Sequence, residues 1–457
     1  MTSSEVKRYL WHMKSHSNPI FAKGLLVSGI LLLPLAALAQ EPSAESWRQT
    51  GPMLGHTSMR TIQTWIQTDA PREVWISYVS EAGGATQETE KVNTAKATSL
   101  AAHHTLTDLE PGTTYELTYW IDGVALETSI SATTQVLWDY RMDPPSFKMV
   151  TGSCAFINEE AYDRPGRPYG GGYEIFEAMA EEDPDMMLWL GDNIYLREVD
   201  FQSYAGFQHR YTHARETPEM GNLLKTCPNY AIWDDHDFGP NDSDGSWVHA
   251  DWSRKAFQEF WSNPSYGLPN APRCISTAFR FVDMEFFLLD NRTYRVNHHN
   301  VTQPAQVLGE DQINWLIQAL QKSRAPFKFV AIGGQVLSDA AVYENVAQFP
   351  SERQQILERI EKEDIRGVVF LSGDRHITEL SEMTLGNGRK VYDLTVSPMT
   401  SGPGHSSDEA NSFRVEGTYV EQRNYAVLSF EGPRKNRSCT VEIKSTAGET
   451  LWAQPLD

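Results

Sequence analysis

The chain has 457 residues, with 39 Lys and Arg against 60 Asp and Glu, which gives a formal net charge of −21. Hydrophobic residues make up 40% of the sequence and aromatic residues 11%, which excludes a disordered chain. The acidic balance argues against a general nucleic-acid binder, because such proteins need a basic surface to displace counterions from phosphates. The length predicts two to four domains of roughly 100–200 residues each.

A secretory signal is predicted at the start of the chain. Residues 24–38 form a short apolar run, which follows a basic lead and ends in Ala37-Leu38-Ala39. This is the order of a signal peptide with a small-x-small cleavage site. The run is shorter than the roughly 20 residues that span a bilayer, so a cleaved signal is favoured over a membrane anchor. We assign residues 1–39 to the signal and expect an exported protein, periplasmic or extracellular, with no membrane span after cleavage.

Residues 40–142 are predicted to form a small antiparallel β-sandwich. Residues 61–68 and 73–79 alternate polar and apolar side chains with the period of half-buried strands. Residues 105–115, with Leu109, Pro-Gly and Tyr115, resemble the corner between strands E and F of fibronectin type III domains. This region gathers no cluster of titratable side chains. We interpret it as a spacer or one edge of a substrate cleft, with surface adhesion as the alternative.

Residues 143–457 are predicted to form an α/β domain. Short apolar strands are expected at residues 148–151, 186–190, 230–233, 285–289, 329–332 and 368–371, and amphipathic helices at residues 173–182, 312–321 and 352–362. The alternation of buried strands with helices is typical of a layered domain.

Four of these strands end in turns that carry potential metal ligands. The turns contain Cys154, Asp192 with Tyr195, Asp235 with His236, and Asp374 with His376. One Asp after a strand is commonly a helix cap. Four such turns are harder to explain as caps, and the carboxyl ends of strands in an α/β sheet are where sites are built. The sequence therefore predicts one shared metal site.

The ligand types indicate two unlike metal ions. The three Asp residues of these turns offer anionic oxygens that suit hard cations, and one carboxylate can bridge two ions. Cys154 as a thiolate and Tyr195 as a phenolate, together with His376, favour an ion such as iron over calcium. Two metals close together can hold a phosphoryl group and lower the pKa of a bound water, so that hydroxide attacks in line. His236 is a candidate catalytic residue that protonates the leaving oxygen or stabilises the transition state.

These motifs resemble those of the alkaline phosphatase D (PhoD-like) family of calcineurin-like metallophosphoesterases. The resemblance rests on Trp233-Asp234-Asp235-His236-Asp237, Gly191-Asp192-Asn193-Ile194-Tyr195 and Gly373-Asp374-Arg375-His376, with further matches at residues 152–154, 289–295 and 308–316. It covers most of residues 147–430, and the upstream β-sandwich matches the usual N-terminal domain of the family. The resemblance implies two mixed sheets flanked by helices, Fe3+ and Ca2+ as cofactors, and hydrolysis of phosphomonoesters and phosphodiesters at alkaline pH.

The resemblance also implies a set of ligands. It assigns iron to four residues, with Asp192 as the bridge: Cys154, Asp192, Tyr195 and His376. It places Asp374 on the calcium side, completed by Asp235 or Asn241. Gln335 stands where many relatives carry a metal-binding His. Because an amide binds metals weakly, Gln335 is either part of a thin calcium shell or a simple turn residue.

Two arginines complete the candidate catalytic residues. Arg292 follows a buried strand, where its guanidinium either binds a phosphate oxygen or forms a structural salt bridge. Arg375 stands between two ligands, where it either supports them or contacts substrate. The pair His298-His299 is expected in a solvated loop. Cys227 and Cys274 are either a disulfide or two free thiols.

We therefore predict an exported, dinuclear metallophosphoesterase that acts on small phosphorylated substrates by metal-activated hydroxide. The alternatives are a dedicated phosphodiesterase or phospholipase-like hydrolase, and a catalytically silent surface-binding protein. The sequence contains no Gly-x-Ser-x-Gly motif, so a serine hydrolase has little support. The oligomeric state cannot be predicted from these patterns.

Overall fold

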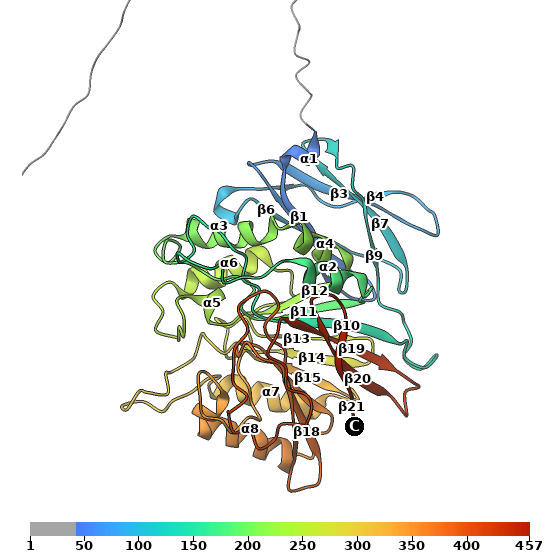
Figure 1. The fold of residues 1–457 in the computed structure, drawn as a ribbon. Helices are drawn as coiled ribbons and strands as arrows, with labels where there is room; N and C mark the ends of the chain where they lie inside the picture. The colour runs from blue at the N-terminus through green and yellow to red at the C-terminus, as the bar shows by residue number, and fades with distance from the viewer. Residues whose placement is uncertain (1–42) are drawn as a thin grey trace, which may run out of the picture. The chain divides into compact units, whose positions relative to one another are not determined.

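Two six-stranded sheets, packed face to face, form the centre of the computed structural model, which describes residues 43–457 (Figure 1). The predicted signal peptide lies outside the described residues. Within the described range, no helix combines the length and the apolar character that crossing a membrane requires.

The first central sheet has the strand order β12-β11-β10-β19-β20-β21. Its strands are β10 (Phe147–Gly152), β11 (Met186–Leu190), β12 (Asn229–Ile232), β19 (Asn424–Glu431), β20 (Ser438–Ser445) and β21 (Thr450–Leu456). Strands β10, β11 and β12 run parallel, whereas β19, β20 and β21 form antiparallel pairs. The sheet is therefore mixed, as the resemblance implies.

The second central sheet has the order β13-β14-β15-β16-β18-β17. Its strands are β13 (Thr277–Phe281), β14 (Met284–Leu288), β15 (Lys328–Ala331), β16 (Val368–Ser372), β17 (Glu379–Thr384) and β18 (Lys390–Thr395). Strands β14, β15, β16 and β18 are parallel, and the two edge strands pair antiparallel. All six strands predicted in this part of the sequence are confirmed, with bounds shifted by one residue or less at each end.

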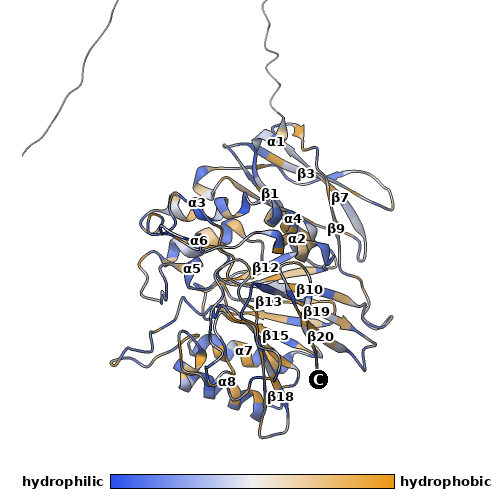
Figure 2. Ribbon diagram, viewed as in Figure 1, coloured by the Kyte–Doolittle hydropathy of each residue, from blue (hydrophilic) through white to orange (hydrophobic). Residues whose placement is uncertain are grey.

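Helices cover the outer faces of both sheets. They are α2 (Glu174–Glu181), α3 (Tyr204–Arg215), α4 (Pro218–Thr226), α5 (Asp235–Phe238) and α6 (Ala250–Phe260) on the first side, and α7 (Glu310–Lys322) and α8 (Pro350–Lys362) on the second. Alternate residues of β11 explain the layering, because Met187 faces the helices while Leu188 faces the other sheet. Both faces of these strands are buried, which is why they read as continuous apolar runs. Figure 2 shows hydrophobic colour on the central strands and hydrophilic residues along α8.

The N-terminal region is an all-β sandwich. One sheet contains β1 (Arg48–Thr57), β2 (Ile62–Thr68) and β6 (Ala101–Leu106); the other contains β3 (Glu73–Ser80), β4 (Gln87–Glu88), β5 (Val92–Asn93), β7 (Thr114–Ile121), β8 (Val124–Ala125) and β9 (Ile130–Thr133). Leu109 is buried in its core, and the Tyr115 hydroxyl accepts the Glu110 N–H at 2.9 Å. The sandwich packs on the α-helical side of the first sheet, where Trp65 donates to the Glu259 carbonyl at 2.7 Å.

Candidate metal centre

The turns after four parallel strands meet at one edge of the paired sheets. Cys154 follows β10, Asp192 follows β11, Asp235 opens α5 just after β12, and Asp374 and His376 follow β16. Backbone hydrogen bonds join the turns, with Ala155 N–H donating to the Asp192 carbonyl at 2.8 Å and Met399 N–H to the Ser153 carbonyl at 2.8 Å. The architecture therefore brings together side chains that lie up to about 220 positions apart in the sequence.

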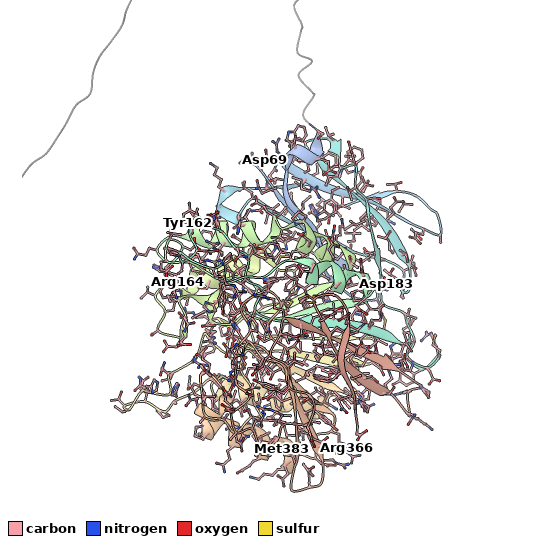
Figure 3. The ribbon with its side chains drawn as sticks, viewed as in Figure 1. Asp69, Tyr162, Arg164, Asp183, Arg366 and Met383 are labelled. Carbon is pink, nitrogen blue, oxygen red and sulfur yellow. The ribbon has the colours of Figure 1, made fainter. Side chains whose placement is uncertain are left out.

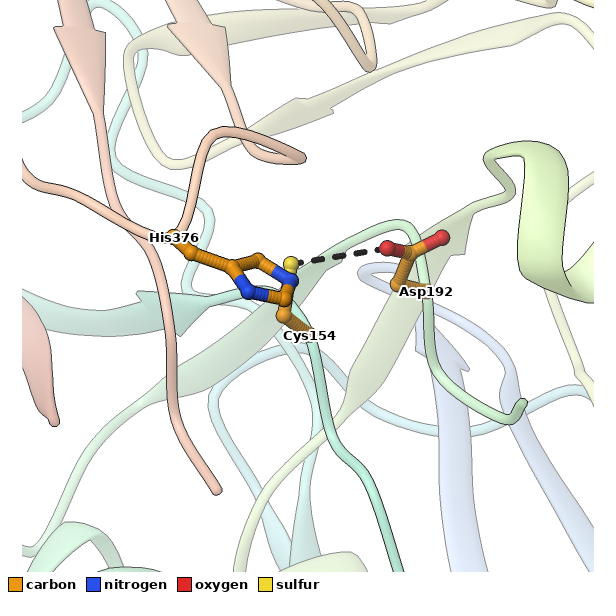
Figure 4. A group of neighbouring side chains, drawn as sticks. All are labelled: Cys154, Asp192 and His376. Carbon is orange, nitrogen blue, oxygen red and sulfur yellow. Dashed lines mark hydrogen bonds between the residues drawn. The ribbon is translucent and has the colours of Figure 1, made fainter. Parts of the chain in front are cut away.

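One group of side chains, Cys154, Asp192, Tyr195 and His376, is here named the thiolate cluster. The Cys154 thiol donates to Asp192 Oδ2 at 3.5 Å, and the Tyr195 hydroxyl donates to the same oxygen at 3.1 Å. The Tyr195 hydroxyl also lies 3.2 Å from His376 Nε2. Figure 4 shows Cys154, Asp192 and His376 directed toward one another from three separate segments. Three of the four are buried, and His376 is partly buried.

Ser397 supports this cluster and was not anticipated from the sequence. Its hydroxyl donates to Cys154 Sγ at 3.1 Å and accepts the backbone N–H of His376 at 2.9 Å. One fully buried hydroxyl thus connects the Cys154 and His376 turns. No motif pointed to it, because Ser397 follows a strand that carries no candidate ligand.

The turns that carry the candidate ligands have an unusual backbone. Cys154, Asp192, Asp374 and His376 have φ values of 62°, 51°, 63° and 54°. Non-glycine residues seldom adopt this left-handed region, and they persist there when the surrounding structure holds them. Gly191, with φ of 91°, has no such cost, and a Cβ at this position would lie 2.8 Å from the Asp234 Cβ. The turns are therefore tight enough to point successive side chains into one site.

Burial and mutual repulsion raise the pKa values of Asp192, Asp374 and Cys154, whereas the charges of His236 and Arg292 lower that of Asp235 against the effect of burial. Burial is the larger cause for Asp192, whose pKa lies well above its ordinary value, and the charge of Cys154 adds to it. Burial, followed by Asp234 and Glu344, raises the pKa of Asp374 to about 8. Burial also raises the pKa of the Cys154 thiol to about 12. Anionic forms of these groups are thus unfavourable without a nearby cation.

A second group, named the arginine-paired cluster, consists of Asp234, Glu344, Arg292 and Arg295. Arg292 donates to Asp234 and to Glu344, and Arg295 lies 2.6 Å from Glu344 Oε1. All four side chains are buried. Arg292 therefore neutralises Asp234 and Glu344, of which Glu344 also lines the cavity, while the fully buried Arg292 does not line it and has no support here as a direct contact for phosphate. Glu344 lies in a loop without a recognisable motif, so sequence reasoning did not find it.

Asp235 lies between the two clusters. Its Oδ2 accepts the Asp242 N–H at 2.7 Å, and its Oδ1 is 3.9 Å from Arg292 Nη2. Among residues 43–457, no hydrogen-bond donor reaches the buried Asp235 Oδ1 or the buried Asp234 Oδ2. Asp235 comes close to Asp192 and His236 on one side and to Asp234 and Glu344 on the other. An unpaired buried carboxylate oxygen of this kind fits a cation.

A cavity of about 710 Å³ opens over these residues. Its lining includes Asp192, His236, Asn241, Asp374, Arg375 and His376, but not Arg292, and within the described part of the chain no residue of the N-terminal sandwich contributes to it. The edge-of-cleft interpretation of that domain is therefore not supported, which leaves the spacer or adhesion interpretations. His298 and His299 lie in a loop, as predicted, with His299 exposed and His298 half-buried, and both line the outer part of this cavity.

Arg375 and Gln335 are hydrogen-bonded to each other, and protein groups occupy both side chains. Arg375 Nη1 donates to Gln335 Oε1 at 2.8 Å, and Nη2 donates to both carboxylate oxygens of Glu409 at 2.7 Å. The Gln335 amide nitrogen donates to Glu379 and Thr395, each at 2.8 Å. Gln335 is thus saturated by protein groups and supports Arg375, which favours the turn-residue interpretation over a metal ligand.

Cys227 and Cys274 do not form a disulfide with each other. Cys227 and Cys274, like Cys154 and Cys439, are buried free thiols. Their environments are apolar cores, which explains their burial without any chemistry.

Two solved structures share this fold. A structure of PhoD superposes with a TM-score of 0.73 at 16% identity and covers 90% of both chains. A purple acid phosphatase from yellow lupin (Lupinus luteus) seeds superposes with a TM-score of 0.64 at 11% identity, over 88% of this chain and 73% of the other. At such identities the likeness shows the fold alone, and that fold is the metallophosphoesterase fold.

The chain belongs to the PhoD-like phosphatase family, whose sequence model matches residues 149–447. The family resemblance of the motifs is thereby confirmed. Alkaline phosphatase D of Bacillus subtilis (strain 168) is 23% identical over 323 residues, which is 59% of this chain and 54% of that protein. The match thus spans about half the length of this relative.

Proposed function

We propose that this protein is an exported, metal-dependent phosphoesterase that hydrolyses phosphomonoesters, phosphodiesters or both. One observation carries the proposal: the thiolate cluster and two further carboxylates converge beneath a single cavity in a member of the PhoD-like phosphatase family. The domain assignment belongs to the same proposal, with residues 40–142 as a spacer or adhesion domain and residues 143–457 as the phosphatase domain.

The donor set fits two unlike cations. The pKa values of Asp192 and Asp374 are raised, and one carboxylate oxygen of Asp235 has no hydrogen-bond donor. Both features are expected of anionic metal ligands when the positive charge of the metal is absent. We assign Fe3+ to the thiolate cluster, because thiolate, phenolate and imidazole suit iron. We assign Ca2+ to oxygen ligands, which are Asp192 as the bridge, Asp235, Asn241 and Asp374. Gln335 is omitted, because its amide is hydrogen-bonded on both sides.

The cations supply one kind of chemistry when bound: they polarise phosphoryl oxygens and lower the pKa of water toward neutrality. The chain supplies the rest. His236 lines the cavity, its ring packs 4.2 Å from that of Tyr195, and its backbone N–H donates to Asp192 Oδ1 at 3.3 Å. This fixed imidazole is suited to protonate the leaving oxygen. Arg292 and Arg375 act by holding the Asp234 and Asp374 turns in place.

The direct test measures metals and turnover together. Elemental analysis of the purified protein is expected to find iron and calcium. Hydrolysis of p-nitrophenyl phosphate and of bis-p-nitrophenyl phosphate is expected to disappear on chelation, and the ratio of the two rates separates a monoesterase from a dedicated phosphodiesterase. Asp192→Asn is expected to abolish both activities while leaving the circular-dichroism spectrum unchanged. A metal-bearing protein that hydrolyses neither ester would support the catalytically silent alternative instead.

A further inference from the structure

Tyr169 places a phenolic hydroxyl on the wall of the cavity, next to the thiolate cluster. The hydroxyl lies 3.0 Å from His376 Nδ1, and the two ring centroids are 6.0 Å apart. The other side of the ring packs edge-on against Phe156 at 4.9 Å. The side chain is 46% exposed, and it lines the cavity together with His376 and His236.

The position of Tyr169 is built by three segments of the chain. Arg423 donates to the Tyr169 carbonyl at 3.2 Å, and the following Gly171 N–H donates to the Thr400 carbonyl at 2.7 Å. Gly402 allows the ring to approach, because a Cβ there would lie 2.9 Å from a ring carbon of Tyr169. By contrast, Tyr162 and Arg164, earlier in the same segment, project from the surface (Figure 3).

Hydrogen-bond directions then determine where the phenolic hydrogen points. His376 turns Nε2 toward the thiolate cluster, with the Tyr195 hydroxyl 3.2 Å away. An imidazole that binds a metal through Nε2 carries its hydrogen on Nδ1 and donates it to a neighbouring acceptor. The acceptor here is the Tyr169 oxygen. The phenolic hydrogen therefore cannot point at Nδ1 and remains available for another acceptor.

Two further observations direct that hydrogen toward the cavity. Within residues 43–457, the Tyr169 hydroxyl has no hydrogen-bond partner other than His376. Arg375 is the one Arg or Lys among the cavity residues of the described chain, and Glu409 already binds it. A neutral donor at this wall thus has no free arginine or lysine side chain beside it.

We propose that Tyr169 is a catalytic residue that accepts the Nδ1 hydrogen of His376 and donates its own hydroxyl hydrogen to an oxygen of a phosphoryl group bound in the cavity. The inference rests on the proposed function and adds a substrate contact to it. Preorganised donors aimed at phosphoryl oxygens contribute most as charge develops in the transition state. The hydroxyl is therefore expected to affect kcat as well as the affinity for phosphate.

The test compares Tyr169→Phe with Tyr162→Phe, a matched tyrosine of the same segment that is 45% exposed. The probes are p-nitrophenyl phosphate and inorganic phosphate as a competitive inhibitor, with iron content and circular dichroism measured on each protein. Tyr169→Phe is expected to retain iron and fold, to lower kcat/KM about 10- to 100-fold and to raise the inhibition constant of phosphate about tenfold or more. Tyr162→Phe is expected to match the wild type.

Other outcomes overturn the proposal in distinguishable ways. Equal kinetics for Tyr169→Phe and the wild type would exclude the donor role while leaving the phosphoesterase function intact. Loss of iron in parallel with activity would reduce Tyr169 to a support for His376 and would overturn the substrate contact. Gly402→Ala is a second variant, which keeps the hydroxyl but crowds the ring, and it is expected to weaken phosphate inhibition without loss of iron. A wild-type protein that neither hydrolyses the ester nor binds phosphate would overturn the proposed function and this inference together.

Discussion

The thiolate cluster and the arginine-paired cluster lie side by side, and both bury acidic side chains. They differ in whether arginine side chains neutralise those groups. In the arginine-paired cluster, Arg292 and Arg295 bind the carboxylates of Asp234 and Glu344. In the thiolate cluster, the partners within the described residues are hydroxyl, thiol, imidazole and backbone groups, and no Arg or Lys forms a hydrogen bond to it. The arginine-paired cluster thus contains its own positive charge, although no donor reaches Asp234 Oδ2, whereas no arginine or lysine of the described chain supplies positive charge to the thiolate cluster.

The largest effect is expected from removing a thiolate-cluster ligand. His376→Ala should lower p-nitrophenyl phosphate hydrolysis by at least about a thousandfold and abolish iron retention, because no protein cation can replace the metal there. Activity and elemental analysis measure this. His209→Ala, which removes a partly exposed imidazole paired with Glu159, is the control and should retain both properties. Full activity in His376→Ala would mean that the cluster is not the metal site.

Removing an arginine from the arginine-paired cluster should lower the stability of the protein. Arg292→Met removes the only cation bound to the buried Asp234 among the described residues and one of the two bound to Glu344, and it is expected to lower the free energy of unfolding by about 3–5 kcal/mol, measured by urea unfolding. Arg366→Met, at an exposed pair with Asp364, should change it by no more than about 0.5 kcal/mol. If both variants were equally stable, the contrast between the two clusters would fail.

His236→Ala tests a residue that belongs to neither cluster. We expect kcat to fall about a hundredfold, the usual contribution of a general acid. Iron and calcium contents should remain those of the wild type, because the imidazole is not among the assigned ligands. Loss of metal in this variant would make His236 a ligand and would extend the metal site toward Asp235.

The smallest effect that we expect is a pH dependence in the stability of the metal-free protein. The pKa of Asp374 is about 8 in the fold, against 3.8 as its ordinary value, so the folded state binds more protons than the unfolded state between these pH values. Stability of the chelated protein should therefore fall as pH rises from 5 to 8, by at least about 1 kcal/mol, since one pKa unit is worth about 1.4 kcal/mol.

Thermal or urea unfolding of the chelated protein at several pH values checks this prediction. Asp374→Asn should flatten the dependence on pH, and reloading the metals should remove it, because bound cations replace the protons. An equally steep dependence in the metal-loaded wild type would show that other groups dominate the titration.

Much of the fold could be predicted because its signals are local. Strands such as β11 and β16 are apolar on both faces, and α7 repeats its apolar residues with helical period. The candidate ligand residues could also be found in the sequence, since each lies in a short turn directly after a predicted strand. The sandwich was recognised from its alternating strands and from the Leu109–Tyr115 corner.

Residues that act through distant contacts escaped prediction. Glu344, Ser397 and Tyr169 stand in loops with no motif, and each acquires its role from a partner 50 to about 240 positions away. Arg292 was a candidate for substrate contact because the sequence shows its charge. The sequence does not show that its side chain is buried and paired with Asp234.

The amino-acid sequence alone determined the family, the strand order along the chain and the identity of the acidic, thiol and imidazole groups, because these depend on residue type and short spacing. Only the tertiary structure decided which carboxylates are neutralised by arginines and which are left for a cation. That division depends on distances of a few Å between segments far apart in the chain, and on burial, which strengthens every charge–charge interaction by excluding water.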